Sequence, residues 1–197
     1  MERGYSTMNR FIIPLIVALL VAGPTSVTFA GIDEGFEAYE RGDYATALKE
    51  FRVSAEQGDA SAQFNLGQLF RRGEGGTKDY KEAMKWYRMA AEQGIIKAQY
   101  NLGVMHFEGQ GVVQDYKEAV KWYWKAAEQG DAAAQFNLGF MFEEGKGITQ
   151  DCREAVRLYR KAAKQGHADA QFNLGLLYEE ETGLTQNDCK EAEKSFS

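Results

Sequence analysis

The sequence predicts an all-α protein, a right-handed α-solenoid of about five stacked helix–turn–helix pairs. The pattern Gln-aromatic-Asn-Leu-Gly occurs at residues 63–67, 99–103, 135–139 and 171–175, each time 36 residues after the previous occurrence. A fixed period of this length indicates one supersecondary unit that is copied and stacked. In addition, no segment alternates apolar and polar residues as a half-buried β-strand does.

The repeat divides the chain into consecutive units. A degenerate first unit spans residues 31–58, complete units span 59–94, 95–130 and 131–166, and a truncated last unit spans 167–197. The last unit has Glu-Thr-Gly where earlier units have Gly-x-Gly, and its second helix stops a turn or two short. Terminal repeats normally need a polar cap, which is not evident here. We therefore expect either a surface for self-association or a frayed end.

Each complete unit is predicted to contain two helices. Apolar residues on one face of the first helix follow a helical period, as in Ala62, Leu66, Gly67 and Phe70. Glycine inside a helix costs about 1 kcal/mol relative to alanine, so its return in each unit predicts a neighbouring helix too close for a Cβ. The second helix follows an aspartate such as Asp79, with glutamate three residues later, which is typical of an N-cap.

Several motifs recur in register: Ala-x-x-x-Leu-Gly-x-x-aromatic, Gly-x-Gly, Asp-Tyr-x-Glu-Ala and Trp-Tyr-x-x-Ala-Ala-Glu-x-Gly. At this period, the combination resembles the Sel-1-like repeat, a relative of the tetratricopeptide repeat with a longer turn between its helices. The resemblance covers residues 31–197. It implies a scaffold or adaptor in regulation, envelope-complex assembly or host interaction. For some relatives it also implies an activity on β-lactams or peptidoglycan fragments.

The first 30 residues have the layout of a secretory signal peptide. Arg10 precedes an apolar run at 11–22, and a stretch of small residues ends at Ala30. The run is short compared with the roughly 20 residues that a membrane-spanning helix needs. We therefore expect cleavage after Ala30, with Met1 or Met8 as the start, and no membrane span afterwards. The predicted location is periplasmic or secreted; an uncleaved anchor is the alternative.

Charge and cysteine usage limit the function further. The formal charge is −6, and this acidic balance argues against nucleic-acid binding, which needs a basic face. Cys152 and Cys189 occupy equivalent places in successive units. Equivalent atoms of stacked helices lie about 10 Å apart, whereas a disulfide needs Cα atoms closer than about 7 Å. We therefore expect two small apolar fillers rather than a disulfide.

The sequence contains no motif of a serine hydrolase or a zinc enzyme. His106 stands where other units have Phe70 and Phe142, so it is predicted to pack in the interior. Adjacent glutamates such as 143–144 are typical of solvated helix ends. We expect no catalytic residue, metal or cofactor. The alternative, from the family resemblance, is an envelope enzyme acting on β-lactams or peptidoglycan fragments.

The binding interpretation starts from the first helices of successive units, which line the concave face of such solenoids. Tetratricopeptide repeats contact peptides at the equivalent positions, as the resemblance implies. The predicted partner-binding residues are Phe64, Asn65, Gln68, Arg71, Tyr100, Asn101, Val104, Phe107, Phe136, Asn137, Phe140, Glu143, Phe172 and Asn173. An asparagine offers a donor and an acceptor to the backbone of an extended peptide. Alternatively, the asparagines brace a neighbouring helix within the fold.

Specificity is expected from the positions that vary between units. Arg71 is replaced by Phe107 and then Glu143, and Gln68 is replaced by Val104 and then Phe140. The groove is thus predicted to be basic at one end and acidic with an apolar floor at the other. This favours a partner protein or peptide with a basic–hydrophobic stretch. Trp124 is a candidate for a second, outer contact. We predict an exported scaffold or adaptor with no reaction of its own.

Overall fold

The computed structural model describes residues 31–179, with side chains as far as Leu176. The predicted signal peptide, its cleavage site and the second helix of the truncated unit lie outside the described residues. Within the described part, none of the helices combines the length and the apolar character needed to cross a membrane.

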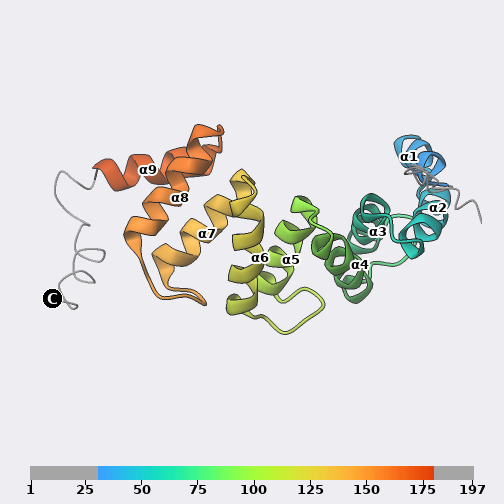
Figure 1. Cartoon of the computed structure of the whole chain (residues 1–197), viewed down its shortest axis with the longest axis horizontal. Helices are drawn as coiled ribbons and strands as arrows, with labels where there is room; N and C mark the ends of the chain where they lie inside the picture. The colour runs from blue at the N-terminus through green and yellow to red at the C-terminus, as the bar shows by residue number, and fades with distance from the viewer. Residues whose placement is uncertain (1–30, 180–197) are drawn as a thin grey trace, which may run out of the picture.

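Residues 31–179 form nine α-helices and no strand, in agreement with the predicted all-α solenoid. The helices are α1 (Ile32–Glu40), α2 (Tyr44–Glu56), α3 (Ala60–Arg72), α4 (Tyr80–Glu92), α5 (Ile96–Glu108), α6 (Tyr116–Glu128), α7 (Ala132–Glu144), α8 (Cys152–Lys164) and α9 (Ala168–Glu179). Extensive contacts join only helices that follow one another in the chain. Figure 1 shows the helix pairs succeeding one another along the long axis, from α1 at one end to α9 at the other.

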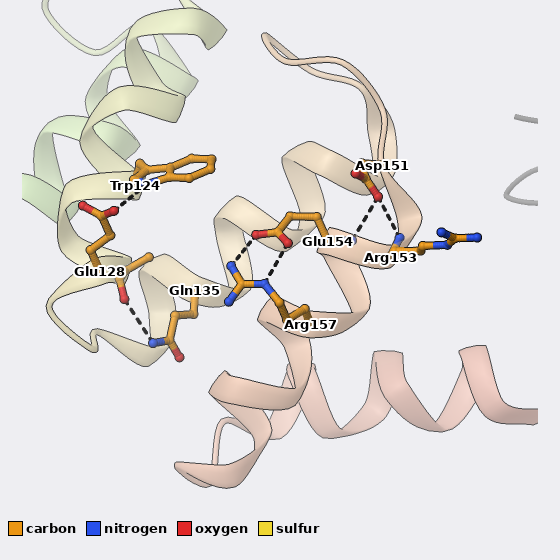
Figure 2. Close-up of polar contacts among 8 residues, drawn as sticks. Trp124, Glu128, Gln135, Asp151, Arg153, Glu154 and Arg157 are labelled. Atoms are coloured by element: carbon orange, nitrogen blue, oxygen red, sulfur yellow. Dashed lines mark hydrogen bonds and ion pairs between the residues drawn. The ribbon is translucent and has the colours of Figure 1, made fainter. Parts of the chain in front are cut away.

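The predicted N-caps are present. The Asp79 carboxylate accepts hydrogen bonds from the main-chain N–H groups of Lys81 and Glu82, at 2.9 and 3.1 Å. Asp151 does the same at the start of α8, as Figure 2 shows. These bonds satisfy N–H groups that have no partner inside the helix, so the aspartates fix where the second helix of each unit begins. The degenerate first unit has the shortened first helix that the sequence predicts.

Within each pair, the two helices meet where a glycine faces a tyrosine. We call this contact the seam; it comprises Gly67, Gly103 and Gly139 against Tyr87, Tyr123 and Tyr159. A Cβ at Gly103 would lie 2.5 Å from the Tyr123 ring, well inside contact distance. The tyrosine rings are almost completely buried. The prediction that a neighbouring helix lies too close for a Cβ is therefore confirmed in these three units.

Successive units are joined by buried glutamines. The Gln63 amide donates to the Ala55 carbonyl at 3.1 Å, and its oxygen accepts a hydrogen bond from Gln93 at 2.8 Å. The same pair of bonds recurs in the following units, and Figure 2 shows the bond from Gln135 to Ala127. Because each glutamine uses both ends of its amide, it can be buried without leaving a polar atom unpaired. The sequence motif contained these glutamines, but their role became clear only in the structure.

The turn between the two helices of one unit packs against the preceding unit. Gly111 has a φ of +76°, and a Cβ there would lie 2.8 Å from the main chain of Tyr80. Only glycine fits this close approach and this left-handed conformation. The turn therefore rests on the start of α4, and it places Gln110 next to Arg71 of α3.

The expectation for the cysteines is wrong in one respect. Cys152 is disulfide-bonded rather than a free apolar filler, while Cys189 lies outside the described residues. The distance argument assumed a perfectly regular stack. The last unit has one residue more before Asp188 than its predecessors have at this place, so the sequence itself departs from the regular repeat on which this argument relied.

Candidate partner-binding groove

We call the predicted partner-binding residues together the groove surface; they lie on α3, α5, α7 and α9. Two of the hollows that the described residues form lie on it. The first, the apolar pocket, has a volume of about 420 Å³ and is formed mainly by α5 and α7. Its lining consists of Tyr100, Val104, Phe107, Glu108, Tyr123, Phe136, Asn137 and Phe140. All of these except Glu108 and Tyr123 belong to the predicted set.

Aromatic side chains form the walls of the apolar pocket. The rings of Phe107 and Phe140 meet edge to face, with their centroids 6.4 Å apart. The ammonium group of Lys146 lies 4.6 Å from the centre of the Phe140 ring and 3.5 Å from the Glu144 carboxylate. Glu108 contributes a carboxylate to the lining. The pocket therefore offers an apolar floor with a negatively charged group at its side.

The second hollow, the polar pocket, has a volume of about 470 Å³. It is lined by Gln68, Arg71, Arg72, Lys78, Tyr80, Tyr87, Asn101 and Gln110. The sequence predicted Gln68, Arg71 and Asn101 as binding residues but not Lys78 or Gln110, which come from the turns between helices. The signal for Gln110 was the Gly-x-Gly pattern, since this turn packs on the preceding unit.

Arg71 is the central cation of the polar pocket. Its guanidinium donates to the Gln110 side-chain oxygen at 3.3 Å and interacts with the hydroxyl of Tyr87. Burial raises the pKa of Tyr87 to about 12, although the positive charges of Arg71 and Arg72 act in the opposite direction. Arg72 is instead 3.6 Å from the Glu74 carboxylate and 2.9 Å from the Tyr39 hydroxyl.

The other predicted residues line neither hollow: Phe64, Asn65, Glu143, Phe172 and Asn173. The Phe64 ring packs on the Tyr87 ring at 5.8 Å, and Asn65 donates to a carbonyl of its own helix. Glu143 accepts a hydrogen bond of 2.5 Å from the Tyr159 hydroxyl. Phe172, on α9, keeps 66% of its surface exposed. Self-association through this end of the stack stays a prediction, which a concentration series of the solution mass would test.

The asparagines make contacts within the fold. The side chain of Asn101 interacts with the Tyr87 hydroxyl, and that of Asn137 interacts with the Tyr123 hydroxyl of α6. Asn173 interacts in the same way with the Tyr159 hydroxyl. These contacts correspond to the bracing alternative, because each asparagine ties the first helix of one unit to the second helix of the preceding one. Since Asn101 and Asn137 also line the two pockets, their amides lie at the groove surface.

His106 packs in the interior, as predicted. It is 5% exposed, and neither ring nitrogen has a hydrogen-bond partner among the described residues. Burial lowers the pKa of His106, since the charged imidazolium would lose its hydration there. Across residues 31–179, no group of three or more His, Cys, Asp and Glu side chains is arranged to hold a metal ion.

Trp124 lies on the outer side of α6. Its indole N–H donates to the Glu128 carboxylate at 3.0 Å, as Figure 2 shows, and its ring meets the Phe142 ring edge to face at 5.9 Å. The indole is 37% exposed. Its role as a second contact surface stays a prediction, and its position makes it a useful control for the groove.

Comparison with known proteins identifies the repeats. The Sel1 repeat family model matches residues 60–95, 96–131, 132–167 and 168–194. One similar solved structure is the crystal structure of c5321, a protective antigen present in uropathogenic Escherichia coli strains. Its sequence is 36% identical to this chain and its TM-score is 0.74; the match covers 79% of this chain and 34% of that one. A Sel1 repeat protein from Oxalobacter formigenes is 38% identical with a TM-score of 0.72, over 78% of this chain and 63% of that one.

The present chain thus spans 34% of the first structure and less than two-thirds of the second. The comparison with curated proteins yields no match. The four family matches follow one another without a gap and coincide, within one residue, with the units that begin at residues 59, 95, 131 and 167. The chain belongs to the Sel1 repeat family.

Proposed function

We propose that this protein is an exported scaffold that binds an extended segment of a partner protein at its groove surface. Sel1 repeats commonly serve as scaffolds for protein–protein interaction. The observation that supports the proposal most strongly is the apolar pocket, which gathers Val104, Phe107, Phe136 and Phe140 around a hollow of about 420 Å³. An apolar hollow with a few polar groups at its side is the usual form of a binding site.

The chemistry of the pocket indicates what it would accept. Burying a large apolar side chain contributes about 1.5–3 kcal/mol, so one aromatic or branched residue of a partner would be a sufficient anchor. The carboxylate of Glu108 in the lining favours a positively charged neighbour of that anchor. A partner segment with a basic–hydrophobic stretch meets both requirements. Such a segment would bind without any chemical reaction.

The proposal of export is supported by two features. Residues 1–30 have the layout of a signal peptide. Cys152 is disulfide-bonded, and disulfides persist mainly in oxidising compartments such as the periplasm or the extracellular space. Mass spectrometry of the protein recovered from its native cells would test this part. A mature chain that begins at Gly31 is expected, and a chain that retains residues 1–30 would contradict it.

An affinity capture from an extract of the native cells tests the groove. The bait is the wild-type chain, with Phe140→Ala as the groove variant and Trp124→Ala as a matched control on the outer face. We expect a partner that wild type and Trp124→Ala retain equally and that Phe140→Ala loses. Circular dichroism of all three proteins verifies that the variants remain folded.

Two results would contradict the proposal. If Phe140→Ala captures the same partner as wild type while Trp124→Ala does not, the binding surface lies on the outer side of α6. If all three proteins capture it equally, neither aromatic residue takes part. A capture experiment with no difference from an empty matrix would remove the support for a stable protein partner.

A further inference from the structure

One set of equivalent positions on the groove surface reverses its charge along the stack. These positions hold Arg71 in α3, Phe107 in α5 and Glu143 in α7. The guanidinium of Arg71 interacts with the Tyr87 hydroxyl. In the third unit the groove residue is an acceptor instead, since the Tyr159 hydroxyl donates to Glu143 at 2.5 Å. The tyrosine is the same in both units, so the charge reversal comes from the groove residue alone.

The positive end is a hollow that lacks a negative partner. Arg71 interacts with two neutral groups, the Gln110 side chain and the Tyr87 hydroxyl. Lys78 lies 5.7 Å from the centre of the Tyr80 ring. Among residues 31–179, neither cation has a carboxylate within ion-pair distance, whereas the adjacent Arg72 is paired with Glu74. A carboxylate from a ligand would supply what Arg71 and Lys78 lack.

The negative end keeps hydrogen-bonding capacity for a ligand. A carboxylate has about four lone-pair sites, and the Tyr159 hydroxyl occupies one of those on Glu143. Glu143 is only partly buried, so a cation can approach it. Between the two charged ends lies the apolar pocket, with Phe107 in its wall. The order along the stack is therefore cation, apolar hollow, anion.

The spacing of the units converts this order into a sequence pattern. Equivalent positions in stacked helical units lie about 10 Å apart. An extended peptide rises about 3.3 Å per residue, so about three residues cover one unit. We propose that the partner segment carries an acidic, an apolar and a basic residue at intervals of about three positions, which bind at Arg71, in the apolar pocket and at Glu143. This inference rests on the proposed groove function, and the spacing is the same for both chain directions.

The negatively charged ligand group that binds at Arg71 is, in this proposal, a carboxylate of the peptide. Arginine binds carboxylates with paired hydrogen bonds. Arg71 lines the polar pocket one unit before the residues of the apolar pocket, so an extended segment held in the apolar pocket would reach Arg71 within a few residues. A polyanion such as a nucleic acid would be repelled by the overall formal charge of −6. A peptide that carries both charges compensates each end of the groove locally.

A display selection with a random library of peptides about nine residues long tests the inference. The full chain is the bait. Enriched peptides are expected to share an apolar residue with an acidic residue about three positions to one side and a basic residue about three positions to the other. Selection on Arg71→Glu is expected to retain the apolar residue and replace the acidic residue with a basic one.

Direct titration of the most enriched peptide gives the magnitude. Arg71→Glu is expected to bind it at least about tenfold more weakly than wild type. Arg41→Glu makes the same change of charge at an exposed residue between α1 and α2, and it is expected to bind as wild type does.

Failure of the inference is distinguishable from failure of the proposed function. Peptides that share the apolar residue but have no acidic residue at a fixed distance would overturn the inference and leave groove binding intact. So would equal affinity of wild type and Arg71→Glu for the enriched peptide. If no peptide is enriched, or if enrichment is unchanged on Phe140→Ala, both the inference and the groove proposal are contradicted.

Discussion

The seam inside each helix pair and the groove surface of the same helices differ in how their residues change along the stack. In the seam, the glycine–tyrosine contact of Gly67 with Tyr87 recurs in the next two units. At the groove surface, equivalent positions change from Arg71 to Phe107 to Glu143. The two regions belong to the same helices, so their difference reflects different physical constraints.

The seam allows no substitution because it has no free space. Close packing means that one added methyl group forces the neighbouring ring or backbone to move. Arg71 and Phe107 face hollows of about 470 and 420 Å³, where a change of size or charge leaves the contact between the two helices of a unit intact. The repeated residues therefore build the fold, while the varied residues on the groove surface can determine which partner binds.

The largest predicted loss of stability comes from a substitution in the seam. Gly103→Ala places a methyl group 2.5 Å from the Tyr123 ring. We expect a loss of about 2 kcal/mol in the free energy of unfolding, because overpacking outweighs the gain in helix propensity. Denaturant unfolding followed by circular dichroism measures it.

Gly76→Ala is the control for this change. Gly76 lies in the turn between α3 and α4 with a φ outside the left-handed region, and no described atom lies within 4 Å of an added Cβ there. We expect the free energy of unfolding to change by less than about 0.5 kcal/mol. Equal losses in the two variants would contradict the claim that the close contact at Gly103 causes the cost.

A somewhat smaller effect is expected from the glutamines between units. Gln135→Leu removes the donor to the Ala127 carbonyl and the acceptor for Gln165. We expect a loss of about 1–2 kcal/mol, because a buried carbonyl is left without a partner. Gln171→Leu is the control, since Gln171 makes the equivalent bond to Ala163 but is exposed. An equally large loss in that control would show that burial does not determine the cost.

The buried His106 is predicted to make the stability of the protein depend on pH, whereas Phe142 at the equivalent place in the next unit does not titrate. Its pKa is lowered from 6.5 by burial, so below about that pH the unfolded chain binds a proton that the folded chain does not. The stability is therefore complete above about pH 6.5 and decreases as the pH falls. His106→Phe, which introduces the residue found at Phe142, is expected to remove this part of the dependence. Melting temperatures between about pH 5 and pH 8 measure it, and parallel curves for the two proteins would contradict it.

The smallest effect on stability is expected at the groove surface. Arg71→Gln removes a partly exposed cation with its contacts to the Gln110 side chain and the Tyr87 hydroxyl, but it leaves the glycine–tyrosine seam intact. The free energy of unfolding should therefore change by less than about 1 kcal/mol. The same denaturant experiment measures the change. A loss as large as that of Gly103→Ala would show that this position is part of the structural core.

The periodic parts of the molecule could be predicted from the sequence. Regular spacing located the helices, the aspartate caps and the close approach at Gly67, because each of these depends on local geometry that repeats. The alignment of equivalent positions also placed Val104, Phe107 and Phe140 on one surface, where the structure shows a hollow.

Contacts that cross between units were harder to foresee. Gln110 reaches Arg71 of the preceding unit because a glycine turn rests on the start of α4. The Gly-x-Gly pattern marks this turn, but it does not reveal which part of the preceding unit the turn contacts. The role of the asparagines likewise depends on how near a tyrosine of the previous helix lies, as for Asn101 and Tyr87. The disulfide of Cys152 was missed because the prediction assumed evenly spaced units.

Binding at the groove surface is tested most directly by a calorimetric titration of the most enriched display peptide into wild type and Phe140→Ala, with the melting temperature of each protein measured beside it. We predict that Phe140→Ala binds the peptide at least about tenfold more weakly, with a melting temperature within about 4 °C of wild type. Such a result would separate binding at the groove surface from the stability supplied by the seam. Unchanged affinity in a folded Phe140→Ala protein would contradict the claim that the groove surface binds the partner.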